Sequence, residues 1–231
     1  MVKKSRKQLW WKVIGGTVIL LLAIFVLRIW ADYRLIKNGN IDLFSLKGAS
    51  LPSGTTPTWE KGAPVLGDAS APIALIEFAD FGCSPSKDES SVLRELLIKY
   101  PAMFRLQFRN FPIVELHPGA DKAAAAGVCA NEQGKFWAMH DKLFANQGAF
   151  ADADLAKYGS EIGLDGNKFT KCMAASEAAK TVSDDIAAGK AEGVSATPTF
   201  FVSFGSGAPV KIEGAVPSDV WETIRAFFVK K

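Results

Sequence analysis

The chain has 231 residues, of which 48% are apolar, including 16 Phe and 6 Trp, and this is enough to fill the core of one domain with additional short segments. The formal net charge is +3, but six of the 27 basic residues precede the first acidic residue, Asp32, so the remaining 21 face 24 acidic residues. This distribution argues against nucleic-acid binding, because a basic cluster confined to the N-terminus is better explained by a membrane.

The first thirty residues predict a membrane anchor. Residues 13–30 are strongly apolar, and tryptophans flank them as they flank segments that cross a membrane. Residues 1–12 are basic, so we expect them in the cytoplasm and the body of the chain outside the cell membrane, as in a single-pass bacterial protein. A cleaved signal peptide is the alternative, but Ile29 stands two residues before Ala31, where a cleavage site needs a small residue.

Residues 31–62 are predicted to form a tether, because they contain turn-forming runs such as Asn38-Gly39-Asn40 and are weakly apolar. Residues 63–231 then form the globular domain. In chain order this domain is expected to begin with a buried strand at 73–78, a helix that starts at Ser84-Pro85 and runs to Tyr100, and a strand at 104–110. A helical stretch follows at 120–191, with breaks near 147–148 and 163–166. Strands at 199–202 and 210–212 and a helix at 218–229 complete the domain. This order predicts an α/β domain with a thioredoxin-like fold and a helical insertion.

Cys83 lies in the predicted turn between the first strand and the first helix. The free N–H groups and the dipole of a helix N-terminus favour a reactive thiolate there. Ser86 stands three residues later, where a redox pair would have its second cysteine. The sequence alone does not distinguish a natural serine from one introduced in place of a cysteine. Serine cannot resolve a mixed disulfide, so any disulfide at Cys83 has to be broken by an external thiol. The alternative interpretation is a small buried cysteine that only packs.

From about Pro64 to its C-terminus, the sequence resembles the DsbA-like branch of thioredoxin-fold proteins. Four segments carry the resemblance: Phe78-Ala79-Asp80-Phe81-Gly82-Cys83, Phe111-Pro112 with His117-Pro118, Gln133-Gly134-Lys135-Phe136-Trp137 with His140-Asp141-Lys142-Leu143-Phe144, and Gly193-Val194-Ser195-Ala196-Thr197-Pro198-Thr199-Phe200. Members of this branch are exported thiol–disulfide oxidoreductases. Ser86 departs from their pattern, and this departure puts net dithiol oxidation in doubt.

The resemblance implies a role for each matching residue. Cys83 would be the nucleophile, and Thr197 and Pro198 would lie beside it, with a cis peptide bond that exposes backbone to a substrate strand. Glu77 would be a partly buried acid that relays protons; an edge or salt-bridged acid is the alternative. Ser86 would hydrogen-bond the thiolate without reacting. No cofactor is implied.

Cys129 and Cys172 both fall in the helical stretch. In an oxidising compartment two such cysteines tend to pair, and relatives carry cysteines at similar places, so we expect a structural disulfide. Closing a loop of this length would contribute about 3–5 kcal/mol. Two buried free thiols are the alternative. The only histidines, His117 and His140, match scaffold positions of the family, so we expect capping or core roles and no metal site.

Three functional hypotheses follow. The first is membrane-anchored thiol–disulfide exchange on cysteine-containing exported proteins, with Cys83 as the single active thiol and an external thiol or a membrane redox partner to release it. The second is a non-catalytic, chaperone-like module that binds peptides. The third is a glutathione-linked transferase or isomerase, a class that is usually soluble and intracellular, so the predicted anchor argues against it.

Overall fold

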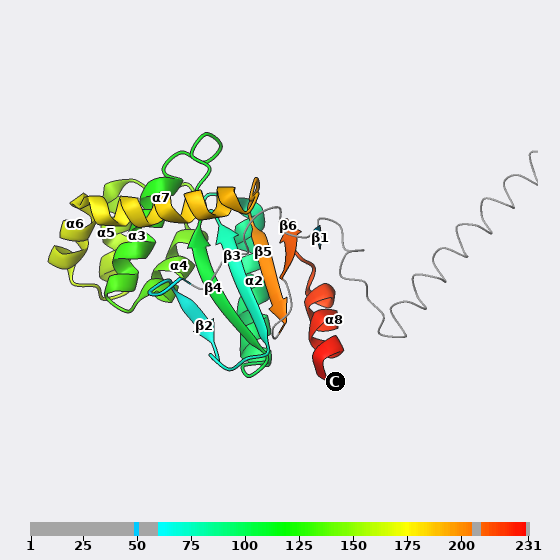
Figure 1. Ribbon diagram of the computed structural model, residues 1–231. Helices are drawn as coiled ribbons and strands as arrows, with labels where there is room; N and C mark the ends of the chain where they lie inside the picture. Colours follow the sequence, from blue (N-terminus) through cyan, green and yellow to red (C-terminus); the bar gives the residue numbers. More distant parts are fainter. Residues whose placement is uncertain (1–48, 51–59, 205–208, 230–231) are drawn as a thin grey trace, which may run out of the picture. The chain divides into compact units, whose positions relative to one another are not determined.

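A computed structural model describes residues 49–50, 60–204 and 209–229 (Figure 1). The predicted basic N-terminus, the anchor at 13–30 and most of the tether lie outside these residues. Every described residue belongs to one compact unit of the chain, residues 43–231. Within the described ranges, no helix is both long and apolar enough to span a membrane.

The described unit is built on one sheet of six strands in the order β1-β6-β5-β3-β4-β2. β3 and β4 are parallel neighbours at its centre, and every other pairing is antiparallel. The strands are β1 (Ala49–Ser50), β2 (Val65–Gly67), β3 (Ile73–Ala79), β4 (Phe104–Asn110), β5 (Thr199–Phe204) and β6 (Val210–Glu213). The four strands expected from the sequence are present within one or two residues of their predicted bounds, whereas the short strands β1 and β2 were not predicted.

Seven helices are described: α2 (Ser84–Lys99), α3 (Ala120–Glu132), α4 (Phe136–Ala145), α5 (Asp152–Glu161), α6 (Gly166–Ala174), α7 (Ser176–Ala191) and α8 (Ser218–Val229). Both predicted breaks in the long helical stretch are present. Two further breaks were missed, one at Gly134, whose φ of +69° ends α3, and one at Ala175, which is extended between α6 and α7.

Helices cover both faces of the sheet (Figure 1). On one face Leu75 of β3 packs in a cluster with Leu93 of α2 and Trp221 of α8. On the other face Phe78 packs with Phe201 and lies near Ile186 of α7. All seven residues of β3 are buried because neither face meets water, which is why this strand is apolar at nearly every position. Glu77 is the exception.

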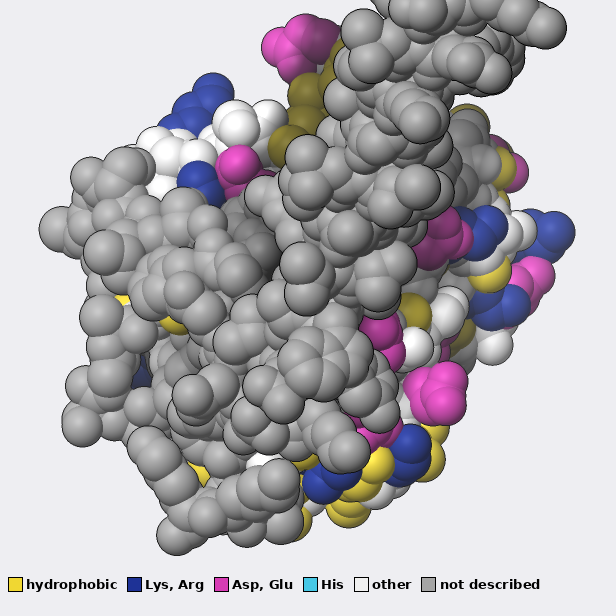
Figure 2. Space-filling model, turned by 90° about the vertical axis from the view of Figure 1, so that its right-hand side faces the viewer, with side chains coloured by type: hydrophobic (Ala, Val, Ile, Leu, Met, Phe, Trp, Pro, Cys, Tyr) yellow, Lys and Arg dark blue, Asp and Glu magenta, His cyan; other side chains and the backbone are white. Residues whose placement is uncertain are grey.

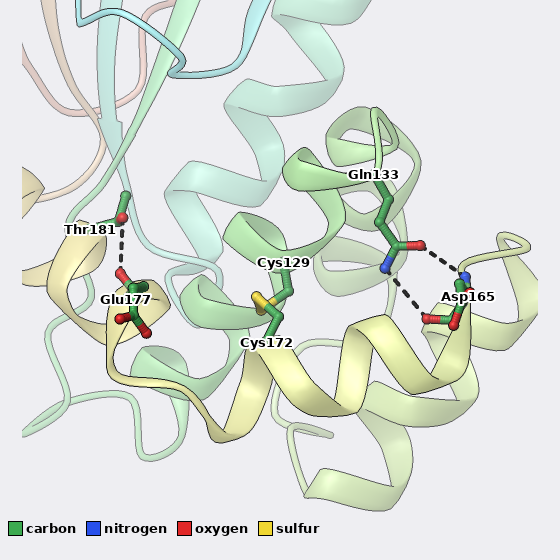
Figure 3. Close-up of a disulfide and its surroundings, with 6 residues drawn as sticks. All are labelled: Cys129, Gln133, Asp165, Cys172, Glu177 and Thr181. Atoms are coloured by element: carbon green, nitrogen blue, oxygen red, sulfur yellow. Dashed lines mark hydrogen bonds between the residues drawn. A yellow bond between two sulfur atoms is a disulfide. The ribbon is translucent and has the colours of Figure 1, made fainter.

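The helical insertion α3–α6 lies beyond β4, and it packs against the rest of the domain through a buried cluster that includes Phe81 and Phe144. Cys129 of α3 and Cys172 of α6 form a disulfide in this layer, with Cα atoms 5.7 Å apart (Figure 3). This is the pairing expected from the sequence. The bridge spans 43 residues, so the chain-entropy model gives it about 4 kcal/mol of stabilisation.

Contacts with the sheet begin at Glu60, three residues before the domain boundary expected from the sequence. The backbone N–H and carbonyl of Glu60 pair with the side-chain amide of Gln107, which is buried in β4. The indole N–H of Trp137 in α4 donates to the carbonyl oxygen of Val65, 3.1 Å away. These contacts tie the start of the domain and the strand β2 to the rest of the sheet.

On the face shown in Figure 2, acidic and basic side chains of the described residues are interspersed. Opposite charges also pair between helices: the Lys99 ammonium of α2 lies 2.7 Å from a carboxylate oxygen of Glu222 in α8. The visible part of this face therefore presents mixed charge.

Candidate active site

Cys83 is the residue on which α2 begins. It has extended backbone angles, its N–H donates to the carbonyl of Asp80, and its own carbonyl accepts the first helical bond from Lys87. Pro85 follows in the first turn, where its missing N–H costs nothing. Only 7% of Cys83 is exposed, and it is the one free cysteine among the described residues.

The loop before β5 lies directly against Cys83. The bond between Thr197 and Pro198 is cis, and the Cys83 thiol donates to the carbonyl oxygen of Thr197 with 3.2 Å between Sγ and O. The structure thus brings together the three residues that the sequence analysis assigned to this contact. The Thr197 hydroxyl is buried beside them and has no partner within the described part of the chain.

A buried aspartate, Asp80, shapes the turn before Cys83. One carboxylate oxygen accepts the N–H of Gly82 at 2.7 Å, and the other accepts the N–H of Ile113 and faces Nδ1 of His117 at 2.7 Å. A side chain on Gly82 would collide with His117, because its Cβ atom would lie 2.4 Å from the β-carbon of that residue, so glycine is required here. His117 thus acts as part of the scaffold, as expected.

The second contact to the turn comes from the helical insertion. Gln147 follows α4, and its side-chain Nε2 donates to the carbonyl oxygens of both Phe81 and Cys83, each at 2.9 Å. The sequence analysis missed both Asp80 and Gln147. Asp80 lay within a matching motif, but Gln147 carried no signal beyond its place at a predicted break between helices.

Ser86 lies one turn into α2, on the same side of the helix as Cys83. It is fully buried, and its hydroxyl has no hydrogen-bond partner among the described residues. Its side chain therefore faces the interior, but it makes no hydrogen bond to the protonated Cys83 thiol, and it brings no second thiol.

Glu77 lies at the centre of the sheet and is 1% exposed. Its Oε1 has no partner in the part of the chain that the structure describes. Burial raises the pKa of Glu77 well above its ordinary value, and the neighbouring carboxylate of Glu89 adds to the effect. The alternative of an edge or salt-bridged acid is not what the structure shows, because β3 is an inner strand and Glu77 forms no ion pair with any described residue.

Glu89 is a second buried acid that the sequence analysis did not single out. It accepts the N–H of Val216 and the indole N–H of Trp221, both at 2.7 Å. Burial raises its pKa to about 7, although these two donors pull in the opposite direction. Its position was readable from the sequence, since Glu89 precedes Leu93, Leu96 and Leu97 at helical spacing on the buried stripe of α2.

Among the described residues, neither a metal site nor a second free cysteine accompanies this group. The described residues contain no cluster of three or more His, Cys, Asp or Glu side chains able to hold a metal. His140 is buried among aromatic rings, including Phe81 and Phe144, and burial lowers its pKa. Cys129 and Cys172 are bonded to each other within the insertion.

The chain matches a family model described as Thioredoxin over residues 60–205, more than half of its length. The chain belongs to the thioredoxin family. Its architecture is also similar to a thioredoxin-like oxidoreductase from Silicibacter pomeroyi, with 27% identity, a TM-score of 0.63 and coverage of 74% of this chain and 95% of the other. DsbA2 from Pseudomonas aeruginosa is similar at 26% identity and a TM-score of 0.59, over 69% of this chain and 91% of the other. The insertion and these likenesses place the protein in the DsbA-like branch of the thioredoxin family.

The relatives found by sequence have a different name. A protein named Na⁺/H⁺ antiporter NhaA 3, from Salinispora tropica, is 39% identical over 139 residues, which are 60% of this chain and 21% of that protein. The thioredoxin-family chain spans about a fifth of the length of the curated relatives it matches. The likeness therefore concerns one region of a much longer protein.

Proposed function

We propose that this chain carries out thiol–disulfide exchange on cysteine-containing exported proteins, with Cys83 as its single active thiol. The observation that carries the proposal is the contact of 3.2 Å between the Cys83 sulfur and the carbonyl of Thr197 in the cis-proline loop. A substrate strand that paired with this loop would bring its own disulfide up to the sulfur. The thioredoxin-family fold supports the same chemistry.

Exchange through one thiol has two balanced steps. The Cys83 thiolate attacks one sulfur of a substrate disulfide, a new S–S bond forms, and the other substrate sulfur leaves as a thiolate. An external thiolate then attacks this mixed disulfide, takes over the bond and regenerates Cys83. Because Ser86 cannot perform the second attack, the sequence of steps rearranges disulfides and causes no net oxidation.

The first step requires the thiol of Cys83 to lose its proton. The thiol donates to Thr197, and a thiolate cannot make that hydrogen bond, so deprotonation frees the sulfur from the loop. We assign Glu77 as the buried acid that exchanges protons with this site, since burial raises its pKa and favours the form that holds a proton to give. The hydroxyl of Ser86 would donate to the thiolate.

We also propose that the domain works outside the cytoplasm, anchored to the cell membrane by residues 13–30. The charge distribution of the N-terminus supports this location. The relatives named as Na⁺/H⁺ antiporters give further support, because exchange of ions requires a membrane to separate them. The thiol that releases Cys83 would then be a soluble thiol or a membrane redox partner.

A second candidate is peptide binding without catalysis. The observation that favours it is the burial of Cys83, which is 7% exposed and has its sulfur turned toward Thr197. In that case the cis-proline loop would hold a peptide strand and the thiol would stay unreacted.

One experiment separates the two candidates. The purified chain is mixed with a peptide that contains a single disulfide, quenched with acid, and examined by intact mass. Exchange predicts one peptide adduct that persists in the native chain, disappears in Cys83→Ala and is released by added glutathione. In Ser86→Cys the adduct should collapse to an internal disulfide. An unreacted native chain that keeps a free, alkylatable Cys83 would establish the binding module instead.

A further inference from the structure

We propose that Gln147 is a positioning residue through which the helical insertion holds Cys83 in its reactive orientation. This inference rests on the proposed function of Cys83. The side-chain nitrogen of Gln147 donates to two carbonyl oxygens of the same turn, those of Phe81 and Cys83, at 2.9 Å each. A single carboxamide thus holds two peptide groups of this turn, the one between Phe81 and Gly82 and the one between Cys83 and Ser84.

Two residues hold the turn, Asp80 through the N–H groups of the turn and Gln147 through its carbonyl groups. Its N–H groups go to Asp80, whose carboxylate accepts Gly82 and whose carbonyl accepts Cys83. Its carbonyl groups go to Gln147. Because Asp80 directly follows β3 and Gln147 belongs to the insertion, the turn cannot rotate without breaking its bonds to one of these two residues.

Gln147 is itself fixed at both ends. Before it, the side chain of Asn146 caps α4 by donating to the carbonyl of Lys142 at 2.8 Å. After it, Gly148 has a φ of +83°, and the next carbonyl, that of Ala149, accepts the hydroxyl of Tyr158 at 3.1 Å. The carboxamide therefore extends from a defined turn and does not need to be ordered when it binds the Cys83 loop.

The reaction is sensitive to this placement. The carbonyl that Gln147 binds belongs to Cys83, and the same carbonyl accepts the first bond of α2 from Lys87. Holding this carbonyl restricts the backbone of Cys83, to which the reactive side chain is attached, beside Thr197. A disulfide exchange needs the attacking sulfur in line with the bond that breaks, and a misplacement of about 1 Å can cost on the order of a hundredfold in rate.

The chain provides a matched control in Gln133. This residue also spans two backbone groups, donating to the carbonyl of Asp165 at 3.4 Å and accepting its N–H at 2.9 Å (Figure 3). Its contacts join α3 to the start of α6 and stay within the insertion. Replacing Gln133 removes the same chemistry as replacing Gln147, but leaves the Cys83 turn untouched.

The test compares Gln147→Met, Gln147→Asn and Gln133→Met in the full chain. The first readout is the rate at which Cys83 forms a mixed disulfide with glutathione disulfide. We expect a fall of about tenfold in Gln147→Met, a smaller fall in Gln147→Asn, whose shorter amide reaches one carbonyl, and a change within about twofold in Gln133→Met. The second readout is amide hydrogen exchange at Gly82 and Cys83, which should accelerate only in the Gln147 variants.

The outcomes separate this inference from the function on which it rests. If the native chain forms no mixed disulfide, the proposed function fails, and hydrogen exchange still decides whether Gln147 holds the turn. If Gln147→Met keeps both the native rate and the native hydrogen exchange, the positioning role is refuted. Equal slowing in Gln133→Met would also refute it, because the effect would then follow the stability of the insertion and not the bond to Cys83.

Discussion

Glu89 makes the stability of this protein depend on pH in a way that can be calculated from its surroundings. Its pKa is raised from 4.5 to about 7 in the folded protein. Between these two values the unfolded chain has lost the proton while the folded chain still holds it. The folded state therefore binds more protons, and stability falls as pH rises. At about 1.4 kcal/mol for each pH unit, the loss amounts to about 3 kcal/mol by the time pH exceeds 7.

The perturbation that tests this reasoning is Glu89→Gln, which removes the titration. Glutamine keeps one acceptor for Val216 or Trp221 but turns an NH₂ group toward the other donor. We therefore expect the free energy of unfolding to fall by about 1–3 kcal/mol, independently of pH. As pH rises to 8, the native chain should lose stability relative to the variant by about 3 kcal/mol. Removing the negative charge at position 89 also makes the pKa of Glu77 less raised in the variant. This adds to the stability that the native chain loses relative to the variant as pH rises.

The assay is urea unfolding of both proteins at half-unit pH steps from 5 to 8. The quantity of interest is the difference between the two free energies of unfolding, because shared titrations cancel in it. A difference that stays flat across this range would refute the assignment of Glu89 as a buried acid that titrates near neutrality.

Three further predictions concern the disulfide, the packing at Gly189 and the buried acid Glu77. Replacing Cys129 and Cys172 together by alanine should lower the free energy of unfolding by about 4 kcal/mol, measured in urea without reductant; an unchanged midpoint would show that the bridge does not constrain the unfolded chain. Gly189→Ala should cost about 1–3 kcal/mol, because its Cβ would lie 2.8 Å from ring atoms of Phe111, and a neutral effect in thermal unfolding would contradict this packing. Glu77→Gln should stabilise the chain at pH 8 more than at pH 5, because stability lost through a raised carboxyl pKa grows with pH; equal effects at both values would count against it.

The sequence predicted the parts of the fold that depend on local pattern. β4 was predicted with its observed bounds, since Phe104–Asn110 is followed by Phe-Pro and preceded by a turn. β2 was missed because three residues carry no periodicity, and its pairing with β4 is a contact between distant segments. Gly134 was not predicted to end a helix, because it lies in the motif Gln133-Gly134-Lys135-Phe136-Trp137, which was used only for the family resemblance.

The same division holds for the site. Cys83, Thr197 and Pro198 could be named from the sequence because each lies in a short motif, although their proximity is a property of the folded chain. Gln147 could not, because a glutamine in a loop has no periodic or chemical signature, and its function comes from a hydrogen bond across 64 residues. Glu89 was missed although its position on the buried stripe of α2 could be seen in the sequence, because a carboxylate on a helix is most often solvated.

The indole of Trp137 has a consequence for how this sheet ends. β2 is only three residues long, and the carbonyl of Val65 that would be available to another strand is already bonded to that indole. Open strand edges are where chains associate and aggregate, and short or covered edges prevent this. The indole thus occupies one acceptor on the outer edge, so another polypeptide finds a short edge with one carbonyl already bonded at β2.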